Sequence, residues 1–102
     1  MYAHGGGAVA GDAKDFGMIA NPTAVTAGVT FFNVDYRLGP ETKAPGGIAD
    51  FYAALKYVVE NAEELGVDKS RICIKGESGG GYICAGTGIM LAEKNESHLV
   101  KF

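Results

Sequence analysis

The chain has 102 residues, with 47% hydrophobic and 21% charged side chains, a balance typical of one small globular domain with a single core. Its net charge of −3 comes without a cluster of Lys and Arg, which argues against a nucleic-acid-binding protein because such proteins need a basic surface. The longest charge-free run in the second half, residues 78–92, is too short to cross a bilayer, and no secretory signal opens the chain.

The first half of the chain predicts two strands around a weak helix. Residues 1–3 have the pattern of a strand end, and a glycine-rich loop follows over 4–12. Residues 13–26 are loosely helical, but we expect Pro22 to break or kink them because proline lacks a backbone N–H. Residues 29–34 are a nearly continuous run of β-branched and aromatic side chains, as in a strand buried on both faces of a parallel sheet.

The clearest predicted helix covers residues 48–65, after a polar connection over 35–47 that is punctuated by Pro and Gly. Its apolar side chains recur every three or four residues, so they form one stripe along the helix. Gly66 follows at the position where a C-terminal cap is expected.

Three more elements are predicted beyond that helix. Residues 72–74 form a short buried strand, 80–94 a second long helix, and 99–102 the start of a further strand. Small residues recur along the second helix at steps of four, three and four, which predicts a face that packs closely against the sheet. These small residues are Gly81, Ala85, Gly88 and Ala92.

The alternation of strands and helices predicts an α/β fold, with a mostly parallel sheet and helices on both of its faces. Residues 1–102 contain no repeat and no linker, so we interpret them as a single unit. Because the chain begins and ends inside predicted strands, and a parallel sheet needs neighbours at its edges, we expect one incomplete core segment of a larger protein.

Two cysteines, Cys73 and Cys84, lie in apolar segments and lack a C-x-x-C spacing. This predicts buried free thiols in a reducing compartment rather than a disulfide or a metal site. The cytoplasm is favoured, but the location stays open because the sequence does not fix the true N-terminus. We expect no metal and no organic cofactor, and the oligomeric state is not readable from the sequence.

Residues 76–80, Gly-Glu-Ser-Gly-Gly, match the pattern G-x-S-x-G between a predicted strand and a predicted helix. In this context the pattern indicates a nucleophile elbow, a sharp turn that exposes the Ser78 hydroxyl and needs small neighbours on both sides. The helix that follows brings free backbone N–H groups and a positive dipole end to the same place. On its own the pattern is also compatible with an idle serine in a glycine-rich turn.

A glycine triplet near the start of the chain favours the elbow. His4 is followed by Gly5, Gly6 and Gly7 at the end of a predicted strand. Backbone N–H groups with no Cβ in the way suit the anion of a tetrahedral intermediate, and the elbow adds the N–H of Gly79. A glycine loop upstream together with G-x-S-x-G downstream is far more specific than either motif alone.

These motifs resemble the α/β-hydrolase fold, and within it the hormone-sensitive-lipase-like esterases, which include arylacetamide deacetylases and many microbial carboxylesterases. Their order and spacing match over nearly all of the chain. The elbow departs slightly from the family, with Gly79 where Ala is usual and Glu77 where Asp is usual, and Gly39 also replaces a usual Ala. The residues that carry the resemblance are 4–7, 34–41, the helix from Ile48 and 76–80.

The resemblance implies a serine carboxylic-ester hydrolase that acts through an acyl-enzyme on small-molecule esters, with amides and thioesters left open. Its nucleophile would be Ser78. Arg37 and Glu41 would have structural roles in ordinary ion pairs. The oxyanion hole would be formed by Gly6, Gly7 and Gly79, with His4 and Glu77 as structural support.

The base and the acid of a catalytic triad are not expected within this chain, because in the resembled family both lie far downstream of the serine. His98 follows Ser78, with Glu93 and Glu96 nearby, but the intervening helix would carry it about 20 Å away. A catalytic contact needs about 3 Å. His4 precedes the serine and opens the glycine loop, so we do not expect it to act as the base. We therefore expect no turnover by the 102-residue chain alone.

Two other functions stay open at this point. Gly5, Gly7 and Ala10 fit the loose form of a dinucleotide-binding loop, with Asp35 placed to bind a ribose. Against this, residues 11–12 interrupt the helix that such a site requires, and the serine elbow would have no purpose. The second alternative is a non-catalytic ligand-binding or receptor protein on the same fold, since the resembled family includes a plant hormone receptor with a disabled triad.

Overall fold

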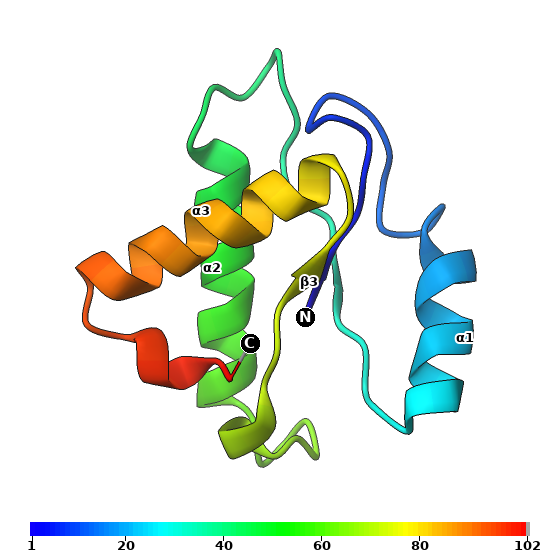
Figure 1. Cartoon of the computed structure of the whole chain (residues 1–102), viewed down its shortest axis with the longest axis vertical. Helices are drawn as coiled ribbons and strands as arrows, with labels where there is room; N and C mark the ends of the chain where they lie inside the picture. Colours follow the sequence, from blue (N-terminus) through cyan, green and yellow to red (C-terminus); the bar gives the residue numbers. More distant parts are fainter. Residues whose placement is uncertain (102) are drawn as a thin grey trace.

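A computed structural model describes residues 1–101 and contains a small parallel sheet with three α-helices (Figure 1). The strands lie side by side in the order β2-β1-β3. Tyr2 is in parallel register with Asn33 on one side and with Lys75 on the other. The strands are β1 (Tyr2–Ala3), β2 (Asn33–Val34) and β3 (Lys75–Gly76).

The chain reverses its direction across the sheet at β1. It passes from β1 through α1 (Gly17–Ala27) to β2, and then back across β1 through α2 (Gly46–Glu60) to β3. Because parallel crossovers are right-handed, this reversal sends α1 and α2 to opposite faces of the sheet. The last helix, α3 (Gly79–Glu93), packs on α2 and on two strands, and α1 stands apart from both helices in Figure 1. The predicted α/β fold is confirmed.

The predicted strand at 72–74 lies beside the start of β1, but regular β structure begins only at Lys75. The amine of Met1 donates a hydrogen bond to the Cys73 carbonyl at 2.9 Å. The N–H of Lys75 donates to the Met1 carbonyl at 3.0 Å. These bonds hold the segment against β1 ahead of the regular strand.

The predicted strand at 29–34 is also shorter than expected, because only Asn33 and Val34 pair regularly with β1. Burial on both faces was a wrong prediction for this segment. Val29 is 49% exposed and residues 31–34 are only half-buried. The reason is that β2 lies at the edge of the sheet formed by residues 1–101, whereas α3 packs on β1 and β3, so the faces of β2 are only partly covered.

Helix α1 continues through Pro22, which was predicted to break or kink it. Proline removes one backbone donor, so the helix lacks the hydrogen bond that would reach the Met18 carbonyl, but it does not end there. It ends at Gly28, whose φ of +62° is a left-handed conformation that favours glycine.

Helix α2 ends at Glu60, earlier than predicted, and the chain continues in less regular turns as far as Gly66. The N–H of Val67 donates to the Ala62 carbonyl at 2.8 Å, and the N–H of Gly66 donates to the Glu63 carbonyl at 3.1 Å. This pair of bonds, with a φ of +67° at Gly66, is a Schellman motif. Gly66 therefore closes the helical segment, as the sequence predicted.

The hydrophobic core lies where α2 and α3 pack against each other and against the sheet. Two clusters of buried side chains fill it, and burial of this kind is the main favourable term in folding. One cluster holds Ala3, Tyr36, Ile48, Phe51 and Ile83, and the other holds Leu55, Val58, Ile72 and Leu91. No helix within residues 1–101 is long and apolar enough to cross a membrane.

The face of α3 that packs into this core is not the predicted face of small residues. A Cβ added to Gly88 would meet nothing within 4 Å, and Ala85 and Ala92 are exposed. Apolar residues surround α3 on all sides, so residue spacing could not tell which stripe faces the sheet. The buried residues of α3 are Gly80, Ile83, Thr87 and Leu91.

The predictions for the cysteines and the C-terminal end need correction. Cys73 is exposed, because side chains alternate along an extended segment and it points away from the side that buries Ile72. Cys84 is half-buried, and burial raises the pKa of its thiol to about 11. Leu99 belongs to a 3₁₀ turn at Ser97–Leu99 and not to the predicted strand. After this turn Val100 is extended, and the N–H of Lys101 donates to the Ile72 carbonyl at 2.8 Å. The last residue of the predicted strand at 99–102 lies outside the described residues.

Candidate active site

Ser78 lies at the turn between β3 and α3, and its backbone is strained. Its φ of 52° and ψ of −118° are unusual for a residue with a side chain, which indicates that the surroundings hold it there. The residue is exposed and precedes the first residue of α3. The N–H of Gly80 donates to the Glu77 carbonyl at 2.8 Å, and the N–H of Gly81 donates to the Ser78 carbonyl at 2.9 Å. These bonds tighten the turn around the serine.

Glycines at the turn allow the strand and the helix to approach closely. A Cβ added to Gly76 would lie 2.1 Å from the Gly80 carbonyl oxygen, so the two ends of the turn touch. A Cβ added to Gly80 would lie 2.0 Å from the Ala3 carbonyl oxygen, so the start of α3 rests directly on β1. Side chains at either position would push the turn open.

The glycine loop after β1 lies against this turn. A Cβ added to Gly79 would lie 2.7 Å from the Gly7 nitrogen and 2.6 Å from the Ala8 nitrogen. A Cβ added to Gly5 would lie 3.7 Å from the Cβ of Ser78. The structure therefore brings together two loops that are far apart in the sequence. It also gives a reason for Gly79, because a methyl group there would collide with the backbone of the glycine loop.

The backbone N–H groups of Gly6, Gly7 and Gly79 are free of hydrogen bonds within residues 1–101. Gly6 and Gly7 adopt φ values of +110° and +63°, which glycine tolerates. The Gly6 carbonyl accepts bonds from the N–H groups of Val9 and Ala10 at 3.1 and 3.0 Å, so the loop is held by its carbonyl side. Free N–H groups beside an exposed serine are the arrangement that stabilises an oxyanion.

His4 is fully buried beside this loop. Its Nδ1 lies 2.7 Å from the Gly5 carbonyl oxygen, and since a carbonyl only accepts, Nδ1 is the donor. The ring is stacked between Phe16, at a centroid distance of 5.2 Å, and Tyr36, at 4.5 Å. These contacts leave His4 in a supporting position under the loop. The two aromatic partners could not be identified from the sequence, because no spacing rule links residues 4, 16 and 36.

Glu77 is half-exposed, and its side chain contributes little to the turn. Its carboxylate lies 3.6 Å from the Lys75 ammonium group. The support that Glu77 gives to the turn comes from its backbone carbonyl, which accepts the hydrogen bond from Gly80. Any residue with the same backbone conformation could supply that bond.

Arg37 ties the connection after β2 to the second turn of α2. Its guanidinium donates two hydrogen bonds to the Asp50 carboxylate, both at 2.8 Å, and its backbone N–H donates a third at 3.0 Å. These bonds hold the pKa of Asp50 below its usual value. The structural role expected of Arg37 fits this geometry. Glu41 is exposed and makes no ion pair with the described residues.

No base reaches Ser78 from within the described part of the chain. His98 is exposed and lies beyond the far end of α3, whose 15 residues span about 22 Å. Glu96 faces α2, where it accepts hydrogen bonds from Tyr52 at 2.6 Å and Lys56 at 3.1 Å. Residues 1–101 also contain no group of three or more His, Cys, Asp or Glu that could hold a metal ion.

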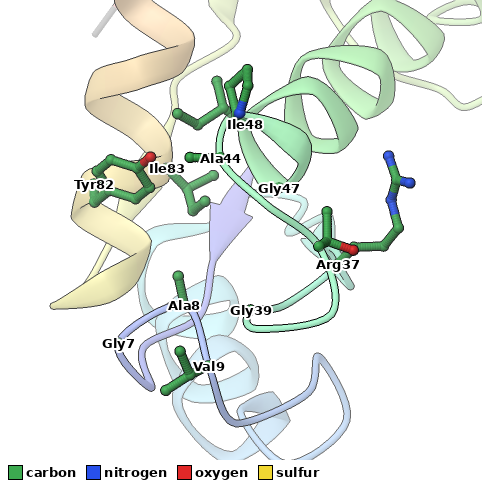
Figure 2. Close-up of a pocket in the computed structure, with 12 residues that line it drawn as sticks. Gly7, Ala8, Val9, Arg37, Gly39, Ala44, Gly47, Ile48, Tyr82 and Ile83 are labelled. Atoms are coloured by element: carbon green, nitrogen blue, oxygen red, sulfur yellow. The ribbon is translucent and has the colours of Figure 1, made fainter.

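A pocket of about 190 Å³ opens beside the glycine loop (Figure 2). One wall is the loop itself, and the others are the connection that leads into α2 and the first turns of α3. Tyr82, one helical turn after Ser78, lies at its edge in Figure 2. Most of its lining side chains are small or apolar: Ala8, Val9, Ala44, Pro45, Ile48 and Ile83.

The geometry argues against the dinucleotide-binding alternative. In such a site the glycine loop opens directly into a helix, whose N-terminus binds the pyrophosphate. Here α1 begins only at Gly17, and Asp35 accepts a hydrogen bond from the Ala13 N–H at 3.0 Å. The loop instead approaches the turn at Ser78.

The chain belongs to the alpha/beta hydrolase fold family, whose model matches residues 1–102. It is 48% identical over 85 residues to carboxylesterase NlhH of Mycobacterium tuberculosis, and these residues make up 83% of this chain and 27% of that protein. It is 34% identical over 84 residues to mouse hormone-sensitive lipase, covering 82% of this chain and 11% of that protein.

Solved structures give the same assignment. A hyperthermophilic esterase from the archaeon Pyrobaculum calidifontis superimposes with a TM-score of 0.93 at 41% identity, covering 98% of this chain and 32% of that one. The thermostable carboxylesterase EstE1 from a metagenomic library gives 0.92 at 42% identity, covering 98% and 34%. The predicted family is confirmed, and the chain spans a third or less of the curated relatives it matches.

Proposed function

We propose that this chain carries the nucleophile and the oxyanion loop of a serine carboxylic-ester hydrolase. The observation that carries the proposal is the contact between the two loops, which sets the free N–H groups of Gly7 and Gly79 next to one another and beside Ser78. The carboxylesterases among the relatives support the substrate class. The chain is, in this proposal, an internal segment of a longer protein whose remaining sequence supplies the histidine and the acid of the triad.

In the proposed mechanism, the Ser78 oxygen forms a bond with the ester carbonyl carbon while its proton passes to the histidine outside this chain. The carbonyl oxygen becomes an anion and is held by the N–H groups of Gly6, Gly7 and Gly79. The positive end of the α3 dipole adds to this stabilisation. Cleavage of the bond to the alcohol leaves an acyl-enzyme, and the alcohol takes the proton from the histidine. Water then repeats the sequence, releasing the acid and restoring the serine.

The test uses the product of the complete reading frame that contains this segment, called the whole protein below. We expect it to hydrolyse p-nitrophenyl acetate and to be labelled covalently by a fluorophosphonate. Ser78→Ala should abolish both, because the remaining groups cannot form an acyl-enzyme. Ser70→Ala is the control, since Ser70 is an exposed residue in a 3₁₀ turn remote from the elbow. A whole protein that binds esters but shows neither turnover nor labelling would instead be a receptor on the same fold.

A further inference from the structure

Two hydrogen bonds hold consecutive carbonyl groups at the start of the glycine loop. The Tyr36 hydroxyl donates to the His4 carbonyl oxygen at 2.6 Å. The Nδ1 of His4 donates to the Gly5 carbonyl oxygen at 2.7 Å. The first bond fixes the peptide unit between His4 and Gly5, and the second fixes the unit between Gly5 and Gly6.

The second of these peptide units carries a proposed oxyanion donor. Since the peptide group is planar and trans, the Gly5 carbonyl and the Gly6 N–H point in opposite directions. A bond that fixes the carbonyl therefore fixes the direction of the N–H. Both flanking residues are glycines, so without this bond the peptide unit could rotate at little steric cost. The φ of +110° at Gly6 is a conformation that few other residues adopt.

The phenol of Tyr36 holds the His4 ring as well as its carbonyl. The two rings are stacked at a centroid distance of 4.5 Å and an angle of 15°. His4 is 0% exposed and Tyr36 is 2% exposed, so water does not compete for these hydrogen bonds. Burial raises the pKa of Tyr36, which keeps its hydroxyl protonated and therefore a donor. Gly11 adds to the enclosure, because a Cβ there would lie 3.0 Å from the His4 Nδ1.

We propose that Tyr36 is a positioning residue for the reaction: its hydroxyl, acting through His4, aims the Gly6 N–H at the oxyanion. The inference rests on the proposed function, because it assigns a purpose to the same loop. It differs from an ordinary structural role in one measurable way. A hydroxyl that only satisfies a buried carbonyl affects stability, whereas a positioning hydroxyl affects the transition state and leaves substrate binding nearly unchanged.

The experiment compares two tyrosine-to-phenylalanine variants of the whole protein. Tyr36→Phe keeps the ring stack and removes only the hydroxyl. Tyr52→Phe is the matched control, because the Tyr52 hydroxyl also makes a 2.6 Å hydrogen bond, to Glu96 on the side of the molecule away from the loop. Removing an oxyanion donor outright lowers kcat by about 10²–10³-fold, so we expect a loosened donor to lower it about tenfold in Tyr36→Phe, with KM within about twofold. We expect no change in Tyr52→Phe.

A trifluoromethyl ketone, which forms a tetrahedral adduct with the serine, gives a second readout. Its inhibition constant should rise in Tyr36→Phe by the same factor as kcat/KM falls, while Tyr52→Phe binds it as the wild type does. His4→Phe, which keeps a ring in the stack but lacks Nδ1, should lower kcat at least as much as Tyr36→Phe. The double variant of Tyr36→Phe and His4→Phe should have a kcat no lower than that of the less active single variant, because both changes act on one loop.

Equal kcat values for Tyr36→Phe and Tyr52→Phe would overturn the inference, as would additive losses in the double variant. These outcomes leave the proposed function intact as long as turnover depends on Ser78. The proposed function would itself be wrong if the wild-type whole protein showed no Ser78-dependent turnover, and this result is separate from the comparison of the two variants. Both tyrosine variants keep their rings, so we expect both to fold. Their unfolding transitions show whether either has lost its folded state.

Discussion

Replacing Gly80 with alanine should damage both the fold and the site, because this position joins them. The added Cβ would lie 2.0 Å from the Ala3 carbonyl oxygen and 2.7 Å from that of His4. Ordinary contacts of this kind are 3.4–4 Å, so α3 and β1 must separate by roughly 1 Å or more. Both contacts are backbone carbonyl oxygens, one in β1 and one in the residue directly after it, so neither can move alone.

The magnitude follows from that displacement. Overpacking of a well-packed site costs about 1–3 kcal/mol, and the rigid backbone here argues for the upper end, about 3 kcal/mol of unfolding free energy. The shift also carries Ser78 and the Gly79 N–H away from the glycine loop. A misplacement of about 1 Å in a catalytic group lowers turnover by about 100-fold.

The assay measures unfolding by urea and hydrolysis of p-nitrophenyl acetate on the whole protein. Gly88→Ala is the matched control, since a Cβ there would meet nothing within 4 Å. As Gly88 lies in the interior of the same helix, alanine should raise its stability by about 1 kcal/mol and leave turnover unchanged. If Gly80→Ala proves as stable and as active as Gly88→Ala, the close contact between α3 and β1 cannot be what positions the site.

Two further predictions concern the chain itself and its response to acid. The 102-residue chain, expressed alone, should show no esterase turnover above background, because no histidine within residues 1–101 reaches Ser78; Ser78-dependent hydrolysis of p-nitrophenyl acetate by that chain would contradict this. Hydrogen bonds from Ser70 and Arg71 lower the pKa of Asp68 from 3.8 to about 2, so its contribution to stability is complete above about pH 3.8 and is lost as the pH falls towards 2. The urea midpoint of Asp68→Asn should therefore vary less with pH over that interval than the wild-type midpoint, and parallel curves would refute the assignment.

Local patterns in the sequence predicted the elements whose causes are local. The stripe of apolar residues in α2 and the cap at Gly66 were readable because each depends on neighbours a few positions away. The orientation of α3 was not readable in this way. Close contacts with other elements accompany its orientation, with Gly80 against β1 and Gly86 against Ile48 of α2, and such tertiary contacts have no local pattern.

In the candidate site, too, local motifs could be predicted from the sequence and tertiary contacts could not. The turn at Ser78 and the loop from Gly5 to Gly7 were visible as motifs, because both need glycine. In the loop, Gly6 and Gly7 have positive φ values, and at the turn glycine lets the strand, the helix and the loop approach closely. The support beneath the loop was not visible. Tyr36 and Phe16 contact His4 only because the chain folds back through β2 and the segment before α1, and many aromatic residues at other positions would have matched the sequence equally well.

The order of the strands explains why two distant motifs meet at all. In an open α/β sheet, ligands bind at the carboxyl ends of the strands, where the direction of the connections reverses. That reversal occurs here at β1, whose neighbours are β2 on one side and β3 on the other. The loops after β1 and β3 therefore leave the same edge of the sheet from adjacent strands. Any sequence that kept both glycine motifs but inserted a strand between β1 and β3 would separate them by about 4.8 Å more, beyond the reach of a shared oxyanion.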